Sequence, residues 1–197
     1  MICPVCKDVQ LKEQELETNL STARCDQCGG HWIRAIQYWE WRGGQAAEGE
    51  IAPGDIPDPS EFQSEATDLE VVVEDHKEAK ICPECSRILT RRPVGRGLDF
   101  TLDRCGTCGG LWFDKNEWQV LKKHGLHEEV HFIFSAAWQA QVAREDKTRA
   151  YEERLQHLLG TEEFNRASEV RQWLLAHPQR NSILSYLCQP ENGEKAS

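Results

Sequence analysis

Eight of the nine cysteines in this 197-residue chain form four C-x-x-C pairs, a spacing at which thiolates bind metal ions. The first two pairs are separated by 18 residues and the last two by 19. Both intervals fall within the roughly 15 to 20 residues typical of a four-cysteine zinc site. Four thiolates complete the tetrahedron that Zn²⁺ prefers and leave no open position for a substrate. The sequence therefore predicts two structural Zn²⁺ ions per chain, one bound by Cys3, Cys6, Cys25 and Cys28 and the other by Cys82, Cys85, Cys105 and Cys108.

Other sites that the sequence suggests have weaker support. A redox-active C-x-x-C pair of the thioredoxin type belongs to a βαβ unit, and the sequence pattern shows no such unit. His124, His127 and His131 could place two imidazoles one helical turn apart, but no H-E-x-x-H pattern accompanies them, and we expect partly exposed side chains. Cys188 is expected to be a small buried residue of the last helix. Because no catalytic triad, phosphate-binding loop or carboxylate pair is present, the chain is not expected to be an enzyme.

An internal repeat with a period of about 80 residues organises the first 125 residues. Residues 3–6 (CPVC) recur at 82–85 (CPEC), and residues 24–32 (RCDQCGGHW) recur at 104–112 (RCGTCGGLW). The glycines that follow the second pair of each copy, Gly29 and Gly109, are expected at positive φ in a tight turn. A segment of about 40 residues cannot bury enough surface to fold alone, so bound zinc is expected to supply much of the folding free energy.

The elements that would position the second set of cysteines can be read from the sequence pattern. Residues 88–90 and 98–103 predict two short strands joined by a turn at 93–97. Asp114 is expected to cap a helix with Glu117 three residues later, and Gly125 to end it. The corresponding helix of the first copy is predicted over residues 33–42. The fold class expected is therefore a small, metal-dominated α+β fold.

These motifs resemble the transcription factor zinc-finger family, named for its similarity to the N-terminal zinc ribbon of transcription factor IIB. The family pattern is CPxC, a strand pair, then C-x-x-C-G-G-x-W followed by a hydrophobic and an acidic residue and ending in Glu. Residues 105–117 (CGTCGGLWFDKNE) match this pattern, whereas Arg34 replaces the acidic residue in the first copy. The resemblance implies two zinc-ribbon folds and covers about 85 of the 197 residues.

The rest of the chain has the composition of a linker and of a helical module. Residues 45–80 are predicted to be an acidic, proline-containing linker between zinc ribbons at 1–44 and 81–125. A β-prone run at 69–73 is expected to pack on the second ribbon, or to bind a partner. Residues 126–188 predict a helical module with helices at about 129–159, 161–174 and 179–188, and residues 189–197 a disordered tail. Phe132, Phe134 and Trp138 are expected to leave an exposed apolar patch there, unless they pack on the second ribbon.

Charge and hydropathy limit the kinds of partner. The net charge is −10, mostly from the linker, so the chain as a whole should repel phosphate backbones. Four arginines on the second hairpin could contact nucleic acid, dock the acidic linker or form a solvated face: Arg87, Arg91, Arg92 and Arg96. We expect a cytoplasmic adaptor that binds an unidentified protein, without a membrane span and with self-association possible through the helical tail. The alternative is a transcription-associated or nucleic-acid-binding factor that uses the arginine hairpin.

Overall fold

The computed structural model describes residues 1–45 and 72–189, so most of the predicted linker and tail lies outside the described residues. The chain forms two compact units, Met1–Glu145 and Asp146–Ser197. Both cysteine-rich repeats lie in the first unit. Of the β-prone run at 69–73, only the last two residues are described: Val72 is exposed and Val73 packs against the core.

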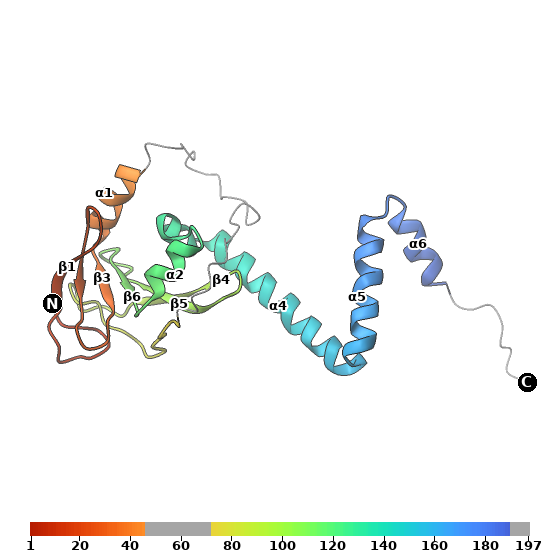
Figure 1. Ribbon diagram of the computed structural model, residues 1–197, viewed down its shortest axis with the longest axis horizontal. Helices are drawn as coiled ribbons and strands as arrows, with labels where there is room; N and C mark the ends of the chain where they lie inside the picture. Colours follow the sequence, from red (N-terminus) through yellow and green to blue (C-terminus); the bar gives the residue numbers. More distant parts are fainter. Residues whose placement is uncertain (46–71, 190–197) are drawn as a thin grey trace, which may run out of the picture. The chain divides into compact units, whose positions relative to one another are not determined.

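One antiparallel sheet of six strands contains both repeats (Figure 1). The first repeat supplies β1 (Lys12–Glu17), β2 (Leu20–Arg24) and β3 (His31–Ile33). The second repeat supplies β4 (Thr90–Gly95), β5 (Leu98–Arg104) and β6 (Leu111–Phe113). The strand order is β1-β2-β3-β6-β5-β4, so the short third strand of each repeat meets that of the other.

The strand β4 differs from its prediction. It begins at Thr90 instead of residue 88, and it continues through Pro93, which was predicted to lie in the turn. Proline is tolerated here because β4 is an edge strand, where one missing N–H donor does not interrupt the sheet. The actual turn is shorter and consists of Arg96 and Gly97, which both have positive φ, as does Gly95 at the end of β4.

The contact between β3 and β6 relates the two repeats by an approximate two-fold axis. Trp32 pairs with Trp112, and the flanking pairs are His31 with Phe113 and Ile33 with Leu111. Each residue of β3 has its counterpart in β6, 80 positions later in the sequence. Exchanging the two repeats therefore leaves the three pairs unchanged, with Trp32 and Trp112 at the centre. The two repeats therefore behave like the halves of a dimer within one chain.

Successive residues of β3 and β6 point to opposite faces of the sheet, and each face has its own core. On one face, Trp32 and Trp112 pack among the buried cysteines of both repeats. On the other face, Ile33, Leu111 and Phe113 pack against the helices. Both cysteine clusters and both tryptophans thus belong to one hydrophobic core.

The helices of the ribbons begin later than the sequence predicts. Helix α1 covers Ala35–Gln45, because Ile33 belongs to β3, and helix α2 covers Glu117–Lys123. Asn116, at φ 72°, is the N-cap of α2 in place of Asp114. The carboxylate of Asp114 instead accepts hydrogen bonds from the Trp112 indole (2.7 Å) and the His76 backbone N–H (2.8 Å). The Glu117 carboxylate still accepts the Asp114 backbone N–H at 2.8 Å, which is half of the predicted capping box.

The start of the predicted helical module packs onto the second ribbon. A 3₁₀ turn (His127–Glu129) and helix α3 (Val130–Ile133) lead into helix α4 (Ala136–Leu159). Trp138 is only 3% exposed, and its indole N–H donates to the carbonyl oxygen of Val94 at 2.8 Å. Phe132 and Phe134 also pack against the core. The exposed patch expected at these residues is therefore absent, because they cover the ribbon.

The second unit is helical and has no buried residue among those described. It contains the remainder of α4, helix α5 (Thr161–Ala176) and helix α6 (Arg180–Leu187). Cys188, expected to be buried, is exposed because α6 buries none of its residues. No helix in the described part of the chain is long and apolar enough to cross a membrane.

Candidate metal centres

The structure brings the eight predicted ligands together as two separate clusters. In each cluster the four sulfur atoms lie within 4.8 Å of one another. In the first, the Sγ–Sγ distances are 3.6 Å between Cys3 and Cys28 and 3.8 Å between Cys25 and Cys6. In the second, they are 3.5 Å between Cys82 and Cys108 and 3.3 Å between Cys85 and Cys105.

These distances suit one tetrahedral zinc ion per cluster. A zinc–sulfur distance of about 2.3 Å places the sulfurs of a regular tetrahedron about 3.8 Å apart. A disulfide needs a separation of about 2.05 Å, and all eight cysteines are free. The zinc ion, when bound, supplies a cross-link between the two ends of each ribbon. The first cysteine of every pair is buried and the second is partly exposed, so each site is closed on its inner side.

Tight backbone turns place each C-x-x-C pair. Gly29 and Gly109 donate their backbone N–H to the carbonyl of the first cysteine of their pair at 2.9 Å, and both have φ of 73°, as predicted. In the other two pairs, Lys7 (φ 65°) and Ser86 (φ 56°) take this conformation without a glycine. Backbone N–H groups also point at sulfur, as from Cys6 to Sγ of Cys3 at 3.3 Å.

The electrostatics of both clusters favour thiolate at one cysteine. The hydrogen bond with the Cys3 thiol lowers the pKa of Cys28 to about 5 and raises the pKa of Cys3. At the second site burial raises the pKa of Cys105, but the backbone N–H groups of Cys108 and Thr107 outweigh it and lower the pKa to about 6. Thiolate is the form that binds metal.

The glycines after the second cysteine pair receive the tryptophan of the opposite repeat. A Cβ added to Gly30 would lie 2.2 Å from Cζ2 of Trp112, and one added to Gly110 would lie 2.2 Å from Cζ2 of Trp32. No side chain larger than hydrogen fits at either position. The G-G-x-W sequence therefore builds the contact between the two metal centres, a role that the repeat itself did not reveal.

A buried ion-pair cluster lies beside the second centre, and no sequence motif marks it. Lys80, assigned to the linker, is 2% exposed, and its ammonium nitrogen lies 2.6 Å from Asp103 and 3.1 Å from Asp114. Asp75, Asp114 and Glu117 also group like metal ligands, but the Lys80 ammonium already neutralises part of their charge. Burial and the Asp114 carboxylate raise the pKa of Glu117 well above its ordinary value. The cluster attaches the end of the predicted linker to the ribbon.

Two of the four arginines of the second hairpin, Arg91 and Arg96, contact other residues of the chain. Arg91 donates to the backbone carbonyls of His76 and Glu78 and pairs with Asp103 at 3.2 Å. The guanidinium of Arg96 stacks over the Trp138 ring, 3.9 Å from its centroid. Docking of the segment just upstream, one of the three roles considered, therefore holds for Arg91. Arg87 and Arg92 are exposed.

The three histidines form no metal cluster within residues 1–45 and 72–189. His127 packs against the rings of Trp41 and Trp118, and His131 packs against Trp39, with ring centroids 5.0 to 5.8 Å apart. Only 14% of the His127 side chain and 21% of the His131 side chain are exposed. They are therefore part of the aromatic packing under α1.

Comparison with known proteins agrees with this geometry. The model of the transcription factor zinc-finger family matches residues 2–41 and 81–124. Comparisons with curated proteins and with solved structures found no match. The two matched segments contain one complete cysteine cluster each and have the same strand order about the approximate two-fold axis. Residues 2–41 and 81–124 are therefore both similar to the transcription factor zinc-finger family, and the structure pairs them through a shared sheet.

Proposed function

We propose that this chain is a non-catalytic adaptor in which two zinc ribbons form a stable base and the C-terminal helical unit, residues 146–189, binds another protein. The ribbons support a zinc-binding structural or transcription-related role in general. Two complete sets of four cysteines correspond to two Zn²⁺ ions per chain. Closed four-thiolate sites stabilise structure and leave no position at which a substrate could bind.

One observation carries the proposed binding role: the C-terminal helical unit has no core of its own. None of residues 146–189 is buried, although α5 and α6 are well-formed helices. Large apolar side chains stay accessible, including Leu158 (76%), Tyr186 (73%) and Trp173 (54%). Short helices are marginal in water unless an apolar face is covered. Tyr151, Leu155, Leu159 and Phe164 also line an open groove between α4 and α5, which a partner helix could fill.

The charge of this unit suits a protein partner better than a nucleic acid. Residues 146–189 contain six acidic and six basic residues, so their net charge is zero. A phosphate-binding surface is normally strongly basic. The alternative function, nucleic-acid binding through the arginine hairpin, would rest on the two exposed arginines, Arg87 and Arg92.

Affinity capture from the native cell with the full chain tests the proposal. Trp173→Glu should reduce recovery of the partner at least about tenfold, as expected for loss of a central aromatic contact. Asn165→Glu adds the same charge at an exposed polar position of α5 and should leave recovery unchanged. Capture that is equal for both variants, or that disappears after nuclease treatment, would contradict the proposal. Sedimentation of the purified chain shows whether the partner is a second copy.

A further inference from the structure

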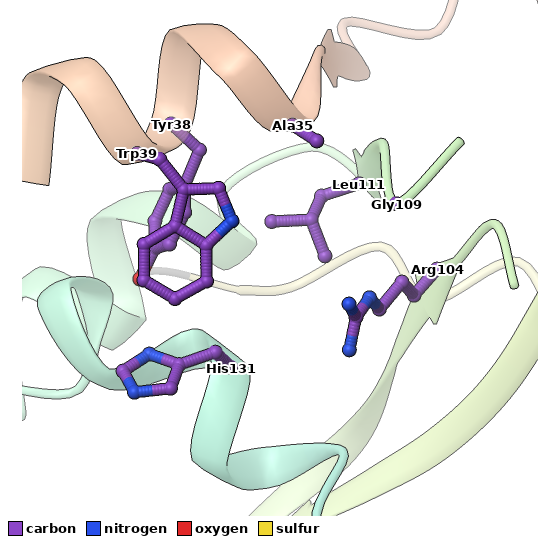
Figure 2. Close-up of a pocket in the computed structure, with 7 residues that line it drawn as sticks. All are labelled: Ala35, Tyr38, Trp39, Arg104, Gly109, Leu111 and His131. Carbon is purple, nitrogen blue, oxygen red and sulfur yellow. The ribbon is translucent and has the colours of Figure 1, made fainter. Parts of the chain in front are cut away.

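Three carboxylates converge beside the second metal centre, on the side chains of Asp75, Asp114 and Glu117. One oxygen of each lies within 4.8 Å of the other two. Asp114 is only 2% exposed and Glu117 only 1%, so most of this cluster is shielded from solvent. The hollow shown in Figure 2, by contrast, has a volume of only about 10 Å³, which is room for about one water molecule. The carboxylate cluster is therefore the stronger candidate for a ligand site in the first unit.

Two hydrogen bonds, one on each side of Asp75 in the sequence, place it against the segment that enters α2. The side-chain amide of Asn116 donates to the carbonyl oxygen of Val72 at 2.8 Å. The backbone N–H of His76 donates to the carboxylate of Asp114 at 2.8 Å. The end of the segment predicted as a linker thus supplies one of the three carboxylates, and the segment that enters α2 supplies the other two.

Glu117 has a carboxylate oxygen that lacks a partner. Its Oε2 atom accepts the backbone N–H of Asp114 at 2.8 Å, whereas Oε1 is buried and has no hydrogen-bond partner in the described part of the chain. Burying an acceptor without a partner is unfavourable, so a proton or a cation has to supply the missing contact. Asp75 also keeps open acceptor positions, because the Thr101 hydroxyl donates only one proton to its carboxylate.

The imidazole of His76 extends this group of ligand atoms. Its Nδ1 atom is buried without a hydrogen-bond partner among the described residues and lies 3.3 Å from Oδ1 of Asp114. Two neighbouring ligand atoms of an octahedral metal ion, each about 2.1 Å from the ion, lie about 3 Å apart. The Nδ1 atom is therefore at a suitable distance to share one metal ion with Asp114.

The surrounding charges favour a cation. The cluster and its ion pairs combine four carboxylates with two basic side chains: Asp75, Asp103, Asp114, Glu117, Lys80 and Arg91. When all six are ionised their net charge is −2, which one divalent ion neutralises. Lys80 pairs with Asp103 and Asp114, so the carboxylates of the other two acids have no ion-pair partner within the described residues. Without a metal ion a proton binds to Glu117 instead, because burial and the Asp114 carboxylate raise the pKa of this side chain.

The first repeat shows that the helix cap itself does not need these acidic side chains. Arg34 and Gln37 are the counterparts of Asp114 and Glu117. Oε1 of Gln37 accepts the backbone N–H of Arg34 at 3.3 Å, which is the same contact that Glu117 makes in the second repeat. A neutral amide therefore serves the cap, and the charge of Glu117 is left for a further partner.

We infer that a divalent metal ion such as Mn²⁺ binds at a third site, which is formed by Asp75, Asp114, Glu117 and His76. Carboxylate oxygens suit Mn²⁺, and an imidazole nitrogen favours a transition metal over Mg²⁺ or Ca²⁺. The bound ion connects the segment before the second ribbon to the segment that enters α2. The site lies outside residues 146–189, so it does not depend on the proposed role of the C-terminal helical unit.

The test titrates the zinc-loaded full chain with Mn²⁺ and measures the free ion by electron paramagnetic resonance. One Mn²⁺ per chain should bind, with a dissociation constant on the order of 10 μM, within the range of carboxylate-rich cation sites. The indole N–H signal of Trp112 in nuclear magnetic resonance spectra should broaden, because this group donates to Asp114 at 2.7 Å. Elemental analysis should still find two zinc ions per chain, which shows that Mn²⁺ has not displaced them from the cysteines.

Two variants and a matched control identify the ligands. Glu117→Gln should weaken Mn²⁺ binding at least about tenfold while the fold persists, because glutamine makes the same cap contact in the first repeat. Asp75→Asn, at a half-buried position, should have the same effect on binding. Glu40→Gln makes the same chemical change at an exposed position of α1 and should bind Mn²⁺ like the wild type. Absence of saturable binding in the wild type, unchanged binding in either ligand variant, or loss of zinc as Mn²⁺ binds would each overturn the inference.

Discussion

Gly110 lies directly against the indole ring of Trp32, so that a Cβ on this glycine would be only 2.2 Å from the ring carbon Cζ2. These two residues belong to different repeats, and the reverse contact joins Gly30 with Trp112. Each repeat therefore needs the glycine of the other. This exchange explains why G-G-x-W follows both of the second cysteine pairs.

Gly110→Ala should destabilise the first unit by about 3 kcal/mol or more, because the added methyl group forces the fully buried Trp32 out of place. Urea unfolding of the zinc-loaded protein measures the change. Gly44→Ala is the control, because a Cβ at that helical position meets nothing within 4 Å. It should raise stability slightly, by about 0.5 to 1 kcal/mol. Combining Gly110→Ala with Trp32→Phe should cost clearly less than the sum of the two changes.

Cys105→Ser should lower the zinc content from two ions to one per chain, because one ligand of the second cluster is lost. Elemental analysis of the purified protein gives this number. The first ribbon should also lose stability, since β3 pairs with β6 of the damaged ribbon. Amide exchange in β2 should therefore become faster than in the wild type. Unchanged exchange there would mean that the two ribbons unfold independently.

Lys80→Met should cost about 3 to 5 kcal/mol, because it removes the buried cation that lies between Asp103 and Asp114 and leaves Asp103 with Arg91 alone. Lys115→Met removes a lysine of the same ribbon from a pair with Glu74, in which both side chains are about half exposed. This control should change stability by no more than about 1 kcal/mol. Similar losses of unfolding free energy in the two variants would show that the buried cluster stabilises the fold no more than the exposed pair does.

His131 should make the folded state less stable in acid. Its folded pKa, lowered to about 4 by burial and by Arg42 and Arg104, lies below the value of about 6.5 in an unfolded chain. The unfolded chain therefore gains a proton first as pH falls, and stability is lost between about pH 6.5 and 4. His131→Gln should remove about 2 kcal/mol of the loss between pH 7 and 5. His157→Gln, at an exposed position of α4, is the control, and urea midpoints at both pH values give the comparison.

The local parts of the metal centres could be predicted from the sequence because ligand type and spacing carry the information. The eight cysteines form the two expected clusters, and the glycines Gly29 and Gly109 have the expected positive φ. The pairing of the ribbons could not be predicted, because β3 and β6 have only three residues each and lie 80 positions apart. No local periodicity marks a contact of that kind.

Residues that depend on long-range partners cannot be placed from the sequence for the same reason. Lys80 looks like part of a charged linker until Asp103 and Asp114 are placed around it. From the sequence, Trp138 is expected to be part of an exposed apolar patch. In the structure its indole N–H donates to the carbonyl oxygen of Val94 in β4. In both cases the polar group of the side chain is paired with a residue that is distant in the sequence. The pattern of a single sequence does not show such a partner.

The two edges of the six-stranded sheet have become chemically different. β1 carries one lysine and three glutamates, whereas β4 carries two arginines and no acidic residue. An unchanged duplication would have presented the same edge at both ends. At the β4 edge, Arg92 is the exposed arginine of the two, and Trp138 and Gln139 already donate to the carbonyls of Val94 and Pro93. The β1 edge instead presents carboxylates. Divergence of the repeats has therefore given the two ends of the sheet different charges, and the start of α4 covers part of one of them.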